Sequence, residues 1–495
     1  MELGNKVIIA GAGPAGLTAC YELIKRGIKP IVIESDDVPG GLSRTVVRDQ
    51  WRFDIGGHRF FTKVKPVEDF WHDILPDNLD FQIRPRLSRI YYQGKFFDYP
   101  LQPVKALKTL GLVESIKCLI SLLYVKIRPP ADMSNYENYV AYKFGWRLYY
   151  TFFKSYTEKV WGIDAKLIQA DWAAQRIKNL SVINMFLHSI NIFKSKKSVT
   201  SLIEEFLYPK LGPGMMWETV ADLCLKNGAD LKFESSVIEI FHKDNKAFAV
   251  TVKNSQGDLE RIDLDNFISS MPLRDLIINL NPSAPVEVVS AAKKLRFRDH
   301  LLVALVVNDP FPFPDNWIYI HYPEVKIGRI QNYGAWSSSM VKEGTTCLGL
   351  EYFVNKDDQI WQMSDDELIS MAKTELSQLN LVKNELIDHG YVVKMVNAYP
   401  VYDLDYRQNL DIIKKWIDEN LVNVFPVGRN GMHRYNNQDH SMYTAMLAVE
   451  NIFGQQNNIW SVNVDTDYHE MKSDNSTGRN APIFNIGQTE NDAYS

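Results

Sequence analysis

The chain has few cysteines and no long uncharged apolar run. Its four cysteines are scattered over 495 residues with no C-x-x-C pair, which argues against a disulfide framework and against a thiolate metal site. We therefore expect a reduced, cytoplasmic protein without a bound metal. We also expect no signal peptide, because the first apolar run, Lys6–Ala10, has the character of a buried strand.

The most apolar helical segment, Val113–Ile127, is too short to cross a bilayer. Its uncharged part, Cys118–Val125, is well below the roughly 20 residues that a spanning helix needs, and Lys117 and Lys126 flank it. We favour a mostly buried helix over the alternative of a helix lying on a membrane surface. No stable membrane insertion is expected.

The chain also lacks an excess of positive charge. Its formal net charge is −5, so nucleic acid is not expected as a partner. A hydrophobic content of 45% and a charged content of 23% are typical of a globular protein, and the length indicates two or three domains. This composition is compatible with a homo-oligomer.

Residues 6–34 contain a strand, a glycine loop, a helix, a second strand and an acid, in that order. The loop carries Gly11, Gly13 and Gly16 at the spacing G-x-G-x-x-G. This spacing allows a tight turn, a close approach of backbone to a pyrophosphate, and close packing of helix on strand. Glu34 ends the second strand, where an acid can take a ribose hydroxyl. The pattern predicts a dinucleotide site, the alternative being a glycine turn without a ligand.

Further glycine segments follow along the chain. Gly40-Gly41 precedes Arg44, which would place bare backbone and a cation beside the cofactor. Gly56-Gly57 precedes His58 and two phenylalanines, which suggests backbone against a flat ring; an ordinary turn is the alternative. Near the end, Gly428-Arg429 stands between a strand and a helix and would direct a second helix N-terminus at the ligand.

Changes in periodicity divide the chain into regions. We expect an α/β fold with a Rossmann-type nucleotide-binding domain from residues 1–100, 201–285 and 416–462. A helical insert is expected at 101–200, a mostly antiparallel substrate domain at 286–415 and a polar tail at 463–495. Within these regions we predict a hairpin at Ile90–Tyr99, a strand over Ile262–Ser270, and a helix over Met363–Leu379 that Ser364 caps.

The helical region contains the segment Tyr156–Gly162, YTEKVWG, followed by Arg176. On spacing alone these side chains are ordinary core and surface residues, and so are Arg329 and Tyr399 in the sheet region. Taken in order with the glycine segments, however, they resemble the flavin-dependent UDP-galactopyranose mutases of the amine-oxidase-like FAD superfamily. The resemblance runs to about Phe453, and YTEKVWG is its most specific part. The chain departs from the mutase pattern at Gly212–Trp217 and at Met432–His440.

The resemblance implies FAD as the cofactor, active in its reduced form, with NAD(P)H as a candidate reductant. The cofactor-binding residues that it implies are Gly11, Gly13, Pro14, Ala15, Gly16, Glu34, Gly41, Leu42, Arg44, Gly56, Gly57, His58, Val237, Gly428, Arg429 and Met442.

The resemblance also implies a nucleotide-diphosphate sugar as the substrate. The implied substrate-binding residues are Tyr156, Trp161, Arg176, Arg329, Tyr399 and Tyr435. Arg329, Arg176 and His58 would be catalytic, the arginines by holding the diphosphate and the histidine by tuning the flavin.

The implied reaction interconverts pyranose and furanose forms of the sugar through a covalent adduct with N5 of the reduced flavin, for surface polysaccharide synthesis. The alternative is an FAD-dependent oxidoreductase of the amine oxidase or desaturase type, which Pro39–Thr45 and the departures after Arg429 favour. Two arginines meeting Tyr156 and Trp161 at the flavin would favour the mutase, and an apolar tunnel would favour the oxidoreductase.

Overall fold

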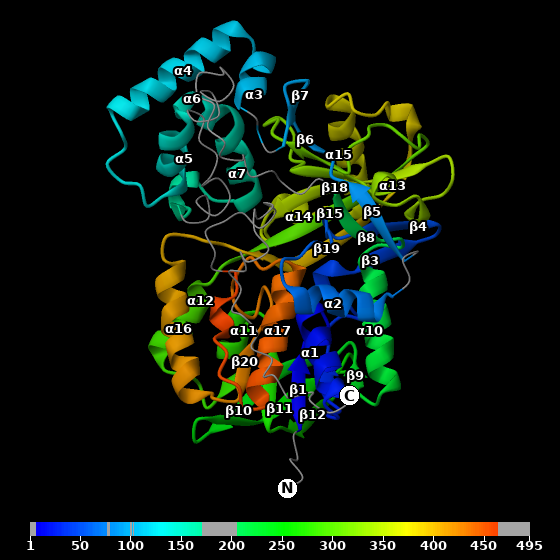
Figure 1. Cartoon of the computed structure of the whole chain (residues 1–495), viewed down its shortest axis with the longest axis vertical. Coiled ribbons are helices and arrows are strands. Elements are labelled where there is room, and N and C mark those ends of the chain that lie inside the picture. The colour runs from blue at the N-terminus through cyan, green and yellow to red at the C-terminus, as the bar shows by residue number, and fades with distance from the viewer. Residues whose placement is uncertain (1–5, 77–79, 100, 102, 171–204, 464–495) are drawn as a thin grey trace, which may run out of the picture.

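The computed structural model describes residues 6–76, 80–99, 101, 103–170 and 205–463. The fold is mixed α/β, with a parallel sheet at one end, an antiparallel sheet above it and a group of helices beside the antiparallel sheet (Figure 1). The predicted fold class is confirmed.

The parallel sheet contains five strands from three distant parts of the chain. In spatial order they are β20 (Val424–Pro426), β13 (Asn266–Ser269), β1 (Val7–Ala10), β2 (Ile31–Ile33) and β9 (Asp230–Lys232). The central strand, β1, is buried along its whole length. The single strand predicted over Ile262–Ser270 is wrong, because the chain changes sheets there: one strand ends at Asp263 and β13 begins at Asn266.

Both faces of the parallel sheet are covered, which is why its strands are apolar without alternation. One face carries the helices α1 (Pro14–Lys25), α2 (Lys65–Ile74), α10 (Gly214–Lys226) and α17 (Gln438–Ile452). The other face carries the helices α11 (Leu273–Ile278), α12 (Val286–Lys294) and α16 (Tyr406–Asn420). Against that face also packs a smaller sheet of β12 (Leu259–Asp263), β11 (Lys246–Lys253), β10 (Ser236–Lys243) and β14 (Leu280–Asn281).

The second large sheet has seven strands. In spatial order they are β19 (Ile387–Pro400), β15 (Phe297–Val307), β18 (Thr346–Val354), β17 (Arg329–Asn332), β16 (Trp317–Ile320), β6 (Ser88–Tyr92) and β7 (Lys95–Asp98). All neighbours are antiparallel except β16 and β6. The hairpin predicted at Ile90–Tyr99 is β6–β7, and it joins this sheet. Helix α15 (Asp365–Gln378) packs on the sheet and begins with the predicted cap, a capping box of Ser364 and Glu367.

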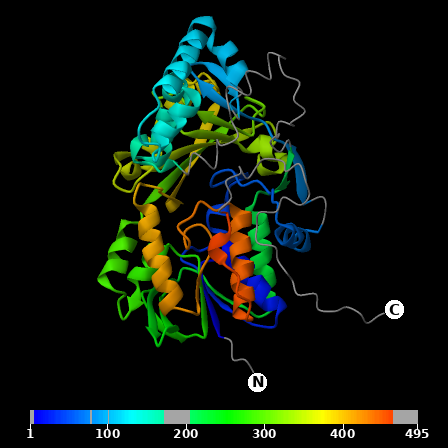
Figure 2. The ribbon, with the colours of Figure 1, turned by 60° about the vertical axis from the view of Figure 1, so that its left-hand side comes forward.

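The helices of the insert pack at the end of the molecule away from the parallel sheet (Figures 1 and 2), around a core that they share with Ile90 of β6 and Phe97 of β7. They are α3 (Pro103–Leu110), α4 (Leu112–Ile127), α5 (Tyr136–Phe144), α6 (Trp146–Leu148), the π-helical turn Tyr149–Phe153 and α7 (Lys154–Trp161). Among the described residues no helix has both the length and the apolar character to cross a membrane.

The prediction that α4 is mostly buried is wrong. Only Cys118, Leu122 and Val125 of this helix are buried, and its other large apolar side chains, apart from the partly buried Leu119, are exposed. Apolar composition alone cannot distinguish a helix covered on all sides from one with a second, uncovered apolar face.

Candidate active site

The first glycine loop brings bare backbone to the N-terminus of α1. Gly11 has a φ of +99°, and a Cβ on Gly16 would come within 1.8 Å of the Gly11 carbonyl oxygen. Gly13 is the N-cap of α1 and provides no side-chain cap, and Pro14 is the first residue of the helix. The N–H groups of the first turn are therefore directed at whatever lies in front of the loop.

Two later segments close around this loop. A Cβ on Gly41 would lie 3.3 Å from Cα of Gly13, and a Cβ on Gly428 would lie 3.1 Å from Cβ of Ala15. Three of the predicted cofactor segments thus meet at one helix N-terminus. Three other predicted cofactor residues contact protein neighbours. Leu42 packs partly buried against a neighbouring core, and Arg44 forms an ion pair with Asp36. The Met442 side chain is fully buried, with its sulfur 3.2 Å from the Trp71 indole nitrogen.

Glu34 is held at the carboxyl end of β2. Its Oε2 accepts a hydrogen bond from the backbone N–H of Ala12 at 2.6 Å, and its Oε1 accepts one from the backbone N–H of Asp36 at 2.9 Å. The carboxylate is thus fixed beside the glycine loop, where a ribose would follow a pyrophosphate.

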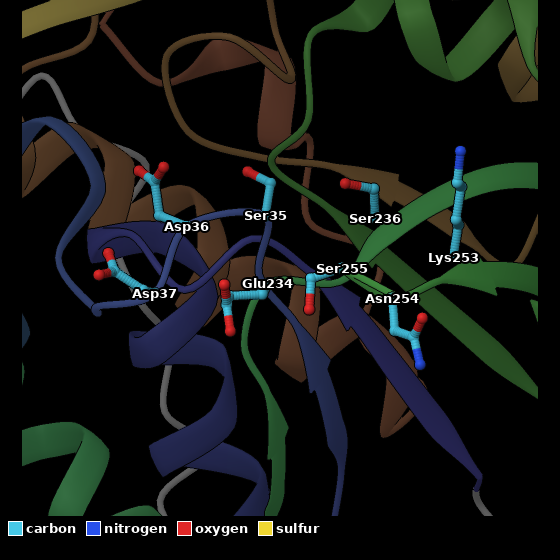
Figure 3. Close-up of a pocket in the computed structure, with 8 residues that line it drawn as sticks. All are labelled: Ser35, Asp36, Asp37, Glu234, Ser236, Lys253, Asn254 and Ser255. Atoms are coloured by element: carbon cyan, nitrogen blue, oxygen red, sulfur yellow. The ribbon is translucent and has the colours of Figure 1, made fainter. Parts of the chain in front are cut away.

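A polar pocket of about 430 Å³ opens beside Ser35, the residue that follows Glu34 in the chain (Figure 3). Its lining comes from the segment after β2, from the start of β10 and the chain just before it, and from the end of β11 and the chain just after it. The residues are Ser35, Asp36, Asp37, Glu234, Ser236, Lys253, Asn254 and Ser255. Val237, one of the predicted cofactor-binding residues, follows Ser236 in β10 and is buried. The pocket therefore lies where the adenosine end of a dinucleotide would leave the loop.

At the other end, the glycine–histidine segment lies against the seven-stranded sheet. A Cβ on Gly56 would lie 3.6 Å from Nη2 of Arg329 and 4.0 Å from the Tyr399 hydroxyl, and one on Gly57 would lie 3.1 Å from Nε2 of Gln331. Desolvation, together with the nearby charges of Arg429 and Arg329, lowers the pKa of His58 to about 3. The His58 imidazole is therefore neutral at physiological pH.

Arg329 is paired with a buried carboxylate. Its Nε and Nη2 donate to the two oxygens of Glu351 at 2.9 and 2.6 Å, and Nε2 of Gln331 donates to the same carboxylate at 2.7 Å. Burial favours the neutral acid, but the Arg329 guanidinium holds the pKa of Glu351 below its usual value. Glu351 does not engage Nη1, which leaves that edge of the guanidinium for a ligand.

Aromatic rings surround the two arginines. Tyr399 and Tyr435 stack with ring centres 5.7 Å apart, and the guanidinium of Arg429 lies 4.7 Å from the Tyr435 ring centre. Trp161 stands 6.3 Å from Tyr435. Its motif partner, Tyr156, stacks on His321 at 4.3 Å with an angle of 9° between the rings.

The YTEKVWG segment is attached to the sheet through Lys159. The Lys159 ammonium donates to the backbone carbonyls of Ile320, Tyr322 and Ile327, at 3.3, 3.0 and 3.0 Å. These carbonyls border the turn between β16 and β17, and β17 begins with Arg329. Helix α7 is thereby fixed against the turn that leads to Arg329. The remaining predicted residue, Arg176, lies outside the described residues.

A family model described as flavin containing amine oxidoreductase matches residues 14–400. The chain belongs to the flavin-containing amine oxidoreductase family. The predicted superfamily is therefore confirmed, and with it FAD as the cofactor.

Curated members of the family resemble the chain over part of their length. A 1-hydroxycarotenoid 3,4-desaturase of Flavobacterium sp. (strain P99-3) is 24% identical over 279 residues, 52% of this chain and 55% of that protein. An L-amino-acid oxidase of Sistrurus catenatus edwardsii is 24% identical over 327 residues, 62% of this chain and 58% of that protein. The chain thus spans little more than half of the curated relatives that it matches.

Solved structures share the fold over nearly the whole chain. A reduced UDP-galactopyranose mutase superposes with a TM-score of 0.79 at 22% identity, covering 92% of this chain and 97% of that one. A putative protoporphyrinogen oxidase from Exiguobacterium sp. 255-15 superposes with a TM-score of 0.66 at 14% identity, covering 92% and 99%. At these identities the comparison shows the fold.

The residues of the site fit the flavin cofactor of the family. The uncapped helix N-terminus suits the diphosphate, Glu34 suits a ribose, and the polar pocket beyond it suits the adenine end. Gly56 and Gly57 bring bare backbone close to the sheet, because a Cβ on either would lie within 3.6 Å of Arg329 or Gln331. In the part of the chain that the structure describes, no cluster of three His, Cys, Asp or Glu side chains could hold a metal ion.

Inspection of the sequence missed Glu351 and Lys159 as members of this site. Glu351 is the only acid in β18, whose residues are all buried. An isolated carboxylate in a strand of that kind requires a cationic or hydrogen-bonding partner, and this signal was available from the sequence. Lys159 belongs to the YTEKVWG motif, but nothing in its spacing indicates the carbonyls that it contacts.

Proposed function

We propose that the protein is an FAD-dependent mutase that interconverts the pyranose and furanose forms of a nucleotide-diphosphate sugar. The observation that carries this proposal is the convergence of Arg329 and Tyr399 on Gly56, with Arg429 and two tyrosine rings beside them. These side chains make the site polar and cationic. An oxidoreductase that binds a hydride donor in an apolar tunnel would not need them. The structural likeness to a UDP-galactopyranose mutase supports the same substrate class.

In this proposal the chain's own residues hold the leaving group. The free edge of the Arg329 guanidinium and the Tyr399 hydroxyl donate to the diphosphate, each charge-assisted contact contributing about 1.5–3 kcal/mol. The diphosphate must stay in place to return to the sugar, and a guanidinium that Glu351 already orients provides a fixed pair of donors for it. Tyr156 provides a flat surface for the nucleotide base. Trp161, the other predicted partner of the base, is only 3% exposed and packs in the core of the helical insert.

When bound, reduced FAD supplies the nucleophile for the anomeric carbon. His58, whose pKa is lowered to about 3 by desolvation, stays neutral and does not add a positive charge beside Arg329. We place the reaction in the cytoplasm, in the supply of sugars for surface polysaccharide, with NAD(P)H as the reductant of the flavin.

The test uses the dithionite-reduced protein, incubated without oxygen with a panel of UDP- and TDP-hexoses and analysed by liquid chromatography. We expect one member of the panel to convert to an isomer of equal mass, without stoichiometric use of the reductant. Arg329→Ala is expected to retain its flavin spectrum and to lose turnover. A panel with no conversion, or an Arg329→Ala variant of normal activity, argues against the mutase.

A second candidate is an FAD-dependent oxidoreductase of the amine oxidase or desaturase type. It is favoured by the curated relatives, which are a carotenoid desaturase and L-amino-acid oxidases. In that case each product formed consumes one equivalent of oxidant. Oxygen consumption, or bleaching of the flavin by an amino acid or a polyene without a nucleotide sugar, distinguishes this activity from the mutase.

A further inference from the structure

Helix α4 has an apolar face that no described part of the chain covers. Seven of its apolar side chains are exposed by between 48% and 79%: Leu112, Val113, Ile116, Ile120, Leu123, Tyr124 and Ile127. At 3.6 residues per turn they fall within an arc of about 120°, along about 22 Å of helix. Isolated exposed apolar side chains are normal, but a continuous stripe of this size marks a contact surface.

The stripe is separate from the face by which α4 packs on the protein. Cys118, Leu122 and Val125 lie on the opposite side of α4 and are buried in the core of the helical insert. The helix is therefore already attached to the protein by one apolar face and presents a second one outward. Figures 1 and 2 place α4 at the outer edge of the molecule, away from the parallel sheet.

Positive charge accompanies the stripe. Residues 103–130 contain five cationic side chains and one carboxylate, although the whole chain has a net charge of −5. The cations are Lys105, Lys108, Lys117, Lys126 and Arg128. The single acid, Glu114, is paired with Lys117 at 2.6 Å and with Arg147 at 2.7 Å. Lys105 is paired with Asp98 at 2.9 Å. Lys108, Lys126 and Arg128 therefore carry the remaining positive charge near the stripe and favour an anionic partner.

We propose that α4 docks the protein on the surface of a membrane that contains anionic lipids. An apolar arc bordered by lysine and arginine is the pattern of a helix that lies in the plane of the headgroups, with its apolar side chains entering the acyl boundary. A second copy of the chain fits less well, because a two-fold contact through α4 would place the same cationic surfaces against each other. This proposal does not depend on the reaction that the protein catalyses.

The experiment is flotation of the FAD-loaded full chain with lipid vesicles, made either of phosphatidylcholine alone or of phosphatidylcholine mixed with phosphatidylglycerol. We expect binding to the mixed vesicles only, weakened by added salt. For the variant Ile120→Ser/Leu123→Ser/Ile127→Ser we expect the amount of vesicle-bound protein to fall by about tenfold or more, because three aliphatic side chains no longer enter the lipid.

A matched control makes the same kind of change elsewhere. Leu259, Val286 and Phe311 are exposed by 64%, 86% and 79% and lie outside the helical insert. Leu259→Ser/Val286→Ser/Phe311→Ser is expected to bind vesicles as the unchanged protein does. The flavin spectrum and the thermal midpoint verify that both variants are folded.

Three outcomes overturn the proposal. The first is that the unchanged protein does not float with mixed vesicles, and the second is that it floats equally with vesicles of phosphatidylcholine alone. The third is that the control variant loses as much binding as the α4 variant. Light scattering tests the other occupant of the stripe. If the unchanged protein is a dimer that does not bind vesicles, and the α4 variant is a monomer, the stripe is the contact with a second copy of the chain.

Discussion

The guanidinium of Arg329 and the carboxylate of Glu351 face each other across neighbouring strands and form a two-point ion pair. Arg329 opens β17, Glu351 lies opposite it in β18, and the Nε–Oε1 and Nη2–Oε2 distances are 2.9 and 2.6 Å. The pairing occupies the Nε–Nη2 edge of the guanidinium, whose Nη2 would lie 3.6 Å from a Cβ on Gly56, and it leaves Nη1 as the edge that Glu351 does not engage. The sheet register therefore determines which edge of Arg329 meets the flavin side of the site.

Removing the Glu351 carboxylate is expected to destabilise the protein strongly. Glu351→Leu leaves the Arg329 charge largely buried without its partner, and breaking such a pair costs about 3–5 kcal/mol. The double variant Arg329→Leu/Glu351→Leu removes both charges and is expected to recover most of this loss. Urea unfolding of the two variants measures the difference, and a single variant as stable as the double one contradicts the ion-pair interpretation.

Lys159 is expected to position Arg329 through the turn between β16 and β17. Lys159→Met removes three hydrogen bonds from a charged donor to backbone carbonyls, each worth about 1.5–3 kcal/mol at most. We expect a lower unfolding free energy and weaker binding of a nucleotide diphosphate, with the flavin spectrum unchanged. Lys166→Met is the control, because Lys166 is largely exposed. Diphosphate binding that Lys159→Met leaves intact would refute the positioning role.

The first glycine loop provides a test of the cofactor site. Gly16→Ala would bring a methyl group within 1.8 Å of the Gly11 carbonyl oxygen, so the loop must move away from the position that meets the diphosphate. We expect purified Gly16→Ala to contain little FAD, as measured by absorbance near the flavin band. Gly257→Ala serves as the control. Gly257 has a φ of +91°, so the substitution strains the backbone, but the added methyl group meets open space. Full flavin content in Gly16→Ala is the result that would count against this loop.

Buried histidines predict a loss of stability on acidification. Burial lowers the pKa of His300 and His433 to about 4 and that of His321 to about 3, from 6.5. The unfolded chain therefore binds more protons than the folded one between these values, and stability falls as the pH drops below 6.5. Each imidazole contributes about 1.4 kcal/mol per pH unit in that range.

Buried carboxyls act in the opposite direction. Burial raises the pKa of Asp54 to about 7 from 3.8, so its contribution is present at low pH and is lost as the pH rises through 7. Burial also raises the pKa values of Glu375, Asp403 and Asp418. The four lowered histidine pKa values, that of His58 included, govern the range just below pH 6.5. Chemical unfolding at about pH 7, 6 and 5 should show this decline in the free energy of unfolding. His321→Phe should reduce the slope of that free energy against pH by about the contribution of one proton. An unchanged slope in His321→Phe would contradict the prediction.

Local chemistry allowed much of the nucleotide half to be predicted. The order of strand, G-x-G-x-x-G loop, helix and Glu34 depends on contacts between near neighbours in the chain, and the capping box at Ser364 is equally local. Such features are determined by a few dozen neighbouring residues, because they depend on turn geometry and on hydrogen bonds along the chain.

Only the tertiary structure decided which distant residues of the chain are in contact. The pairing of Arg329 with Glu351, the three carbonyls that Lys159 contacts, and the place of Gly56 over the sheet all join residues far apart in the sequence. The same holds for α4: its apolar pattern is plain in the sequence, but which of its two faces is buried depends on the helices packed against it. A sequence specifies which side chains need a partner, and only the folded chain shows which partner each has found.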